Sequence, residues 1–98
     1  MLVALRSISI KKQTDDVFVV TVTDSVTTTH TVTVTDQSLA DLTDNNVTKT
    51  QLLEFSFNFF LDREPNTSIL SSFDINVISR YFSDYRDEVR RWRDAGQN

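Results

Sequence analysis

Two neighbouring stretches of the chain alternate between two kinds of side chain, and this alternation constrains the fold more than any other feature. In Val17–Thr23 one set of alternate residues is Phe or Val, and in Thr28–Thr35 one set is entirely Thr. A period of two residues is typical of a β-strand with one buried and one solvated face. The core face of these two strands is predicted to hold Phe18, Val20, Val22, Val32 and Val34, with His30 beside them.

A third strand is predicted over residues 2–10, where Ile8 and Ile10 alternate with serines. Polar turns separate the three segments, so residues 1–35 are expected to form a three-stranded antiparallel meander. A small sheet with one apolar face is not stable alone and needs a covering layer. The rest of the chain must therefore supply that layer.

The covering layer is predicted to centre on a helix that begins at Thr48. Thr48 is a favourable N-cap, and Gln51 three residues later completes a capping box. Pro65 disfavours helical backbone in the residue before it, so the helix is expected to end near Arg63. The helix is apolar around most of its circumference, apart from one narrow polar stripe of Glu54, Asn58 and Asp62.

A helix that is apolar on several sides needs more cover than three strands give, and this excess predicts a partner. We expect self-association, as a homodimer, through the face that carries Phe55 and Phe59 or through a sheet edge. The charged corner after the helix offers two further interface candidates, Arg63 and Glu64. The alternative is a structural corner in which Arg63 pairs with Glu64 or another carboxylate, and this alternative is favoured.

Shorter helices are expected around the long one. A helical turn begun by Asp36 or Ser38 is predicted within residues 36–47. After the proline, Asn66 or Thr67 is predicted to cap a short helix that continues through Phe73.

Asp74 is predicted to cap the segment that follows. The class is then α+β, a single domain of residues 1–98 in which helices of the C-terminal half (48–95) cover one face of the sheet.

The last helix is predicted to begin at Ser83 or Asp84 and to end at Gly96, with an apolar stripe that includes Tyr85 and Val89. Positive charge is concentrated in this helix. Its basic and aromatic residues are alternative phosphate and base contacts for a nucleic acid: Arg86, Arg90, Arg91, Arg93 and Trp92. Because acidic residues are interleaved with them, a solvated helix packed on the body is favoured.

Composition excludes several kinds of catalytic and cofactor site. The 98 residues contain no cysteine, so disulfides, thiolate metal sites and thiol catalysis are absent. The single glycine, Gly96, cannot form a phosphate-binding glycine loop. His30 is the only histidine, which leaves no second histidine for a metal site and no credible catalytic triad. We therefore predict no catalytic residue, no cofactor and no metal, and a protein that is not an enzyme.

The charge and the hydropathy of the chain indicate where in the cell the protein is expected. The formal net charge is −4, which disfavours a general nucleic-acid coat. No run approaches the roughly 18 apolar residues of a membrane span, and the first residues lack the basic start of a secretory signal. A cytoplasmic protein without a membrane partner is expected.

The run from Phe55 to Tyr85 contains FxFxLDREPNTSIL followed by SFDINVISRYFSDY. It resembles a group of short uncharacterised prokaryotic proteins with a hairpin, a Phe/Leu-rich helix and an Arg-Glu-Pro corner. The resemblance implies a natural small domain and supplies no activity or site. The leading hypothesis is thus a small non-enzymatic protein that acts through protein–protein interaction, with a nucleic-acid-binding accessory protein as the alternative.

Overall fold

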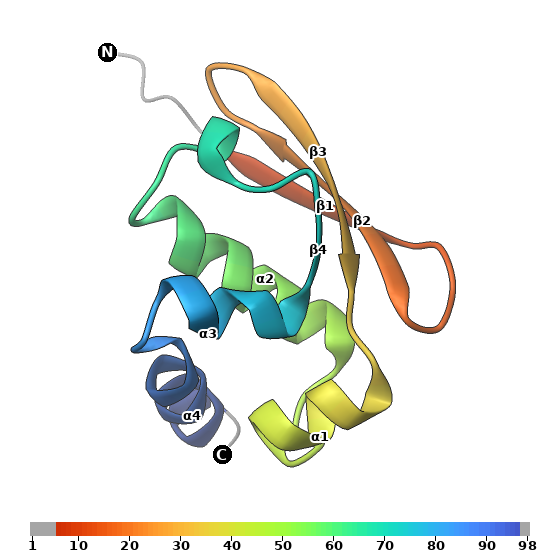
Figure 1. Cartoon of the computed structure of the whole chain (residues 1–98), viewed down its shortest axis with the longest axis vertical. Helices are drawn as coiled ribbons and strands as arrows, with labels where there is room; N and C mark the ends of the chain where they lie inside the picture. The colour runs from red at the N-terminus through yellow and green to blue at the C-terminus, as the bar shows by residue number, and fades with distance from the viewer. Residues whose placement is uncertain (1–5, 97–98) are drawn as a thin grey trace.

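A computed structural model describes residues 6–96 and shows an α+β arrangement, with a sheet on one side and helices on the other (Figure 1). The sheet has four strands in the order β1-β2-β3-β4. Their bounds are Ser7–Lys12, Val17–Thr23, Thr27–Thr33 and Ser72–Asp74.

The predicted antiparallel meander is found in the first three strands of the sheet. β1 pairs with β2 and β2 pairs with β3, both antiparallel, with Ile8 opposite Val22 and Val20 opposite His30. Residues 2–5 of the first predicted strand lie outside the described residues. The predicted core face is also confirmed, since all five of its residues are at most 3% exposed: Phe18, Val20, Val22, Val32 and Val34.

The fourth strand was not predicted and corrects the fold. β4 lies parallel to β3, with Phe73 opposite Val32, so the sheet is mixed. The predicted helix through Phe73 is therefore wrong: only the single turn η1 (Asn66–Ser68) forms there, and its N-cap is Pro65 without a side-chain bond. Parallel pairing requires a long crossover, and the segment between β3 and β4 contains the longest helix of the fold.

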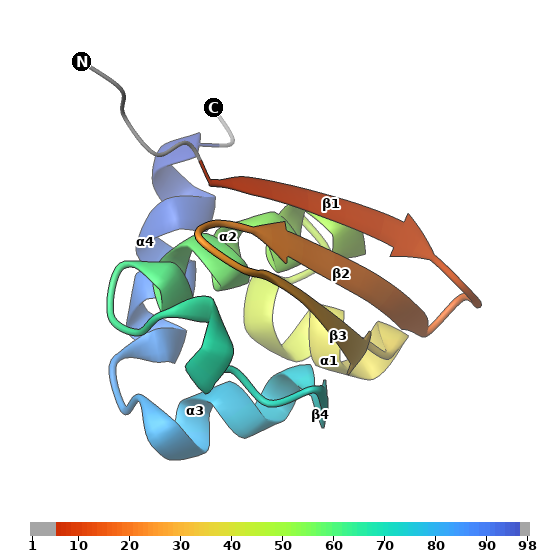
Figure 2. The ribbon, with the colours of Figure 1, turned by 90° about the horizontal axis from the view of Figure 1, so that it is seen from above.

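The helices all lie on one face of the sheet (Figure 2). In chain order they are α1 (Asp36–Thr43), α2 (Lys49–Leu61), the turn η2 (Ile75–Val77), α3 (Ile78–Tyr81) and α4 (Tyr85–Gly96). α2 lies next to the sheet, and α4 lies on the side of α2 that faces away from it (Figure 1).

The capping box of α2 is confirmed by two reciprocal bonds. The backbone N–H of Gln51 donates to Thr48 Oγ1 at 3.1 Å, and the backbone N–H of Thr48 donates to Gln51 Oε1 at 2.9 Å. Asp74 caps η2 as predicted, by accepting from the backbone N–H of Asn76 at 2.9 Å. α1 begins at Asp36, one of the two predicted starts, and its N-cap is Thr35, which accepts from the backbone N–H of Ser38.

The core lies between the sheet and α2. Leu52, Leu53 and Phe57 of α2 are fully buried, as are Val20 and Val32 of the sheet. Burying such apolar side chains is the main favourable term in folding. Among residues 6–96, no helix combines the length and the hydropathy that crossing a membrane requires.

Candidate functional site: a groove beside α3

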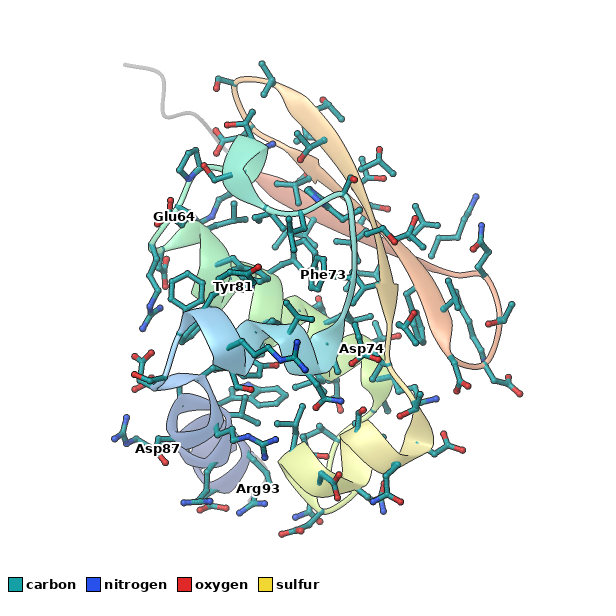
Figure 3. The ribbon with its side chains drawn as sticks, in the orientation of Figure 1. Glu64, Phe73, Asp74, Tyr81, Asp87 and Arg93 are labelled. Carbon is teal, nitrogen blue, oxygen red and sulfur yellow. The ribbon has the colours of Figure 1, made fainter. Side chains whose placement is uncertain are left out.

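An apolar groove of about 350 Å³ opens between the end of α2, the segment after η1, and α3. Its floor and walls include Phe60, Ile69, Phe73 and Phe82. Three further lining residues stand at its rim: Glu64, Leu70 and Tyr81. Figure 3 labels Glu64, Phe73 and Tyr81, which reach it from three different segments of the chain.

Aromatic contacts build the floor of this groove. Phe60 meets Phe73 edge to face, with ring centroids 5.8 Å apart, and meets Phe82 at the same distance. Edge-to-face pairs at such distances add a modest stabilisation beyond burial. The floor is therefore an apolar surface of aromatic rings that contact one another.

The segment that forms one wall is tied to the sheet by Asn66. Its side-chain amide donates to Val26 O and to Thr28 Oγ1, both at 3.0 Å, and Asn66 is 3% exposed. These partners lie in β3 and the turn before it, about 40 positions earlier in the chain. Asn66 thus fixes where the chain goes after the Pro65 stop.

His30 makes the second tie. Leu70 O can only accept, so His30 Nδ1 donates to it across 2.7 Å, and His30 Nε2 forms a second hydrogen bond with the hydroxyl of Thr28 at 2.8 Å. His30 is 2% exposed and its ring lies 5.4 Å from that of Phe57. The single histidine therefore positions the groove wall at Leu70 and is closed off from solvent.

The rim combines exposed apolar side chains with one unpaired charge. Tyr81 is 68% exposed and Leu70 is 48% exposed, and both line the same groove. Glu64 makes no ion pair within residues 6–96. The groove therefore offers an apolar interior with a carboxylate at its mouth.

Arg63, beside Glu64, has a structural role. Its guanidinium binds Asp84 at 3.0 Å and Phe59 O at 3.0 Å, and it stacks 3.6 Å above the Phe59 ring. The favoured expectation was that Arg63 pairs with Glu64 or another carboxylate, and its partner is Asp84. Arg63 joins the end of α2 to the start of α4, and Glu64 is left available at the groove.

The predicted interface at Phe55 and Phe59 is covered by the chain itself. Phe59 is 5% exposed, and its ring meets those of Phe82 and Tyr85 edge to face at 5.5 and 5.3 Å. Phe55 is half-buried and stacks on Trp92 with centroids 4.7 Å apart. The predicted exposure of Phe59 is wrong, because Phe82 after α3 and Tyr85 of α4 supply the cover that three strands could not.

The basic residues of α4 are mostly paired with carboxylates. Arg91 pairs with Glu88, Arg90 lies 3.7 Å from Asp87, and Arg93 reaches Asp44 at 2.8 Å. Arg86, Arg90 and Arg93 also line a small hollow of about 130 Å³ against the end of α1. Two of its other lining residues are Asp41 and Asp44, so the hollow carries both positive and negative charge.

The groove escaped the sequence analysis because its residues come from segments with no regular period. Two signals were available: Glu64, which the sequence offered as an interface candidate, and Tyr81, a large side chain beside the buried stripe of a very short helix. Comparison of the chain with known protein families, with curated proteins and with solved structures finds no match. Its function must therefore be argued from the groove itself.

Proposed function

We propose that this protein is a small non-enzymatic interaction domain that binds a protein partner in the groove beside α3. The observation that carries the proposal is the exposure of Leu70 and Tyr81 at the rim of an apolar groove. Contiguous exposed apolar surface on a small domain marks an interaction site more often than isolated exposed residues do. Aromatic residues such as Tyr81 are enriched at such interfaces.

The lining favours a protein segment over a polar small molecule. Small-molecule sites place several polar groups around a ligand to fix its orientation. Here Glu64 is the one charged side chain in the lining, and Ser68 adds a hydroxyl, while the rest of the lining is mainly apolar. A volume of about 350 Å³ accommodates one or two large apolar side chains of a partner, with a cation beside Glu64.

Nucleic-acid binding by α4 is the second candidate, and the geometry supports it less. Base stacking needs exposed indole surface, and Trp92 is half-buried with one of its two faces already covered by Phe55. Phosphate binding needs unpaired cations, and three of the four arginines of α4 already lie beside carboxylates. Arg86 alone does not make a phosphate-binding track.

Peptide selection with matched variants tests the proposal. Peptides displayed on phage are selected on the wild-type protein, and their affinity is then measured for Leu70→Asp and for Val26→Asp. Both residues are 48% exposed, but only Leu70 lines the groove. We expect apolar peptides with a basic residue, at least about tenfold weaker on Leu70→Asp and unchanged on Val26→Asp. Equal loss on both variants, or none on either, would remove the groove as the binding site.

A further inference from the structure

We propose that the partner in the groove is a second copy of this chain, which inserts Tyr81 into the groove and places Arg80 beside Glu64. This inference rests on the proposed function, since it names the occupant of the same groove. It also moves the predicted self-association from Phe55 and Phe59 to the surface of α3.

Shape is the first argument. A symmetric dimer uses the same patch on both copies, so that patch must carry both a protruding side chain and a recess to receive it. Among residues 6–96, Tyr81 is the most exposed large hydrophobic residue, at 68%, and it stands on the rim of the groove. A two-fold axis beside α3 therefore lets each Tyr81 enter the groove of the other copy.

Charge is the second argument. Neither Arg80 nor Glu64 forms an ion pair within residues 6–96, and both side chains belong to exposed residues. Arg80 directly precedes the protruding Tyr81, whereas Glu64 lies at the mouth of the groove. The protruding element is flanked by a cation and the recess by an anion, which is complementary between two copies.

The interface is expected to be weak. The groove is small, and interfaces that bury less than about 1,200 Å² in total belong to transient complexes. We expect a monomer of 11.3 kDa at low concentration and a dimer that forms over about 10–500 μM. The same full chain is used throughout the test.

The test is sedimentation equilibrium of wild type, Glu64→Arg, Arg80→Glu, and a mixture of the two variants. Each single variant would place like charges opposite each other twice in its own dimer, so we expect association at least about tenfold weaker than wild type. In the mixed dimer both contacts become opposite charges again, so the mixture should recover association. Circular dichroism verifies that each variant is folded, and Tyr81→Ala, at an exposed position, provides a second monomeric variant.

The outcomes separate this inference from the proposed function. If each single variant associates weakly and the mixture recovers association, the result supports a second copy as the occupant of the groove. A wild type that stays monomeric up to about 500 μM overturns it. The inference is also overturned if both single variants dimerise as strongly as wild type does. In either of those cases, peptides that lose affinity on Leu70→Asp would keep the groove as a site for a different protein.

Discussion

At the scale of single residues, buried polar side chains decide how the segments are joined. Ser56 in α2 donates to Leu52 O at 2.7 Å, so it accepts from the Tyr85 hydroxyl across 2.6 Å. Tyr85 is fully buried, and this burial raises the pKa of its hydroxyl well above the usual value. This hydrogen bond thus joins α4 to α2 in addition to the ring contacts between the two helices.

The variant Tyr85→Phe should show a stability change that depends on pH. At neutral pH the loss of this bond should lower the free energy of unfolding by about 1 kcal/mol. Tyrosine in the unfolded chain ionises near pH 10, whereas Tyr85 in the fold stays neutral to higher pH. Wild type therefore loses stability as the pH rises above about 10, and the variant escapes this loss. Urea unfolding from pH 7 to 11 should show that the difference in the free energy of unfolding between wild type and Tyr85→Phe becomes smaller as the pH rises. If Tyr81→Phe escaped the loss of stability at high pH to the same extent, the loss could not be assigned to Tyr85.

Residue-level partners were also the least predictable part of the structure. The sequence predicted that Asn66 could cap a helix, but its side chain reaches back to Val26 and Thr28 instead. A local pattern carries no information about partners some 40 residues away. The buried face of the strands, by contrast, follows from a period of two within a few residues, and that prediction was correct.

Asn66→Ala should therefore cost far more than an ordinary surface change. It leaves Val26 O and Thr28 Oγ1 without this donor in a partly buried place, and we expect a loss of about 1–3 kcal/mol in the free energy of unfolding. Asn46→Ala, at an exposed position, should stay within about 0.5 kcal/mol of wild type. Chemical denaturation measures both; equal effects would mean that Asn66 does not anchor the wall of the groove.

At the scale of elements, predictability followed length and the presence of local signals. α2 has a capping box, a proline stop and an apolar pattern over 13 residues, and it forms where predicted, although it ends at Leu61. β4 has three residues and α3 has four, too few to show a period. The groove lies beside these short elements, which is why, of its lining residues, only Glu64 was among the interface candidates chosen from the sequence.

The N-cap of α2 gives a test at this scale. Thr48→Ala removes the acceptor of the Gln51 N–H and leaves that donor dependent on water, so we expect a loss of about 1 kcal/mol in the free energy of unfolding. Thr48→Ser keeps a hydroxyl in the same place and should retain most of the stability. Thermal and urea unfolding compare the three proteins; a Ser variant as unstable as the Ala variant would rule out the hydroxyl as the stabilising group.

At the scale of the whole molecule, the apolar surface of α2 that the sheet leaves uncovered remains accessible mainly on one face. α4 covers the outer side of α2 through the Phe55–Trp92 and Phe59–Tyr85 contacts, so that side offers little free surface. α3 is too short to cover the end of α2, and the groove opens there. The prediction of a partner from the composition of α2 therefore remains a proposal, now placed at the end of the helix and not along its length.

The two candidate functions predict opposite behaviour of Trp92, which is the only tryptophan in the chain. Because its ring stacks on Phe55 at 22° and the neighbouring arginines are paired, we expect a single-stranded oligonucleotide to leave its fluorescence unchanged at low salt. Phe55→Leu removes the stacked ring and serves as the matched control for access to the indole. Quenching in wild type that disappears steeply with added salt would show phosphate contacts and would favour the nucleic-acid function. Quenching only in Phe55→Leu would show that the intramolecular stack is what withholds Trp92 from bases.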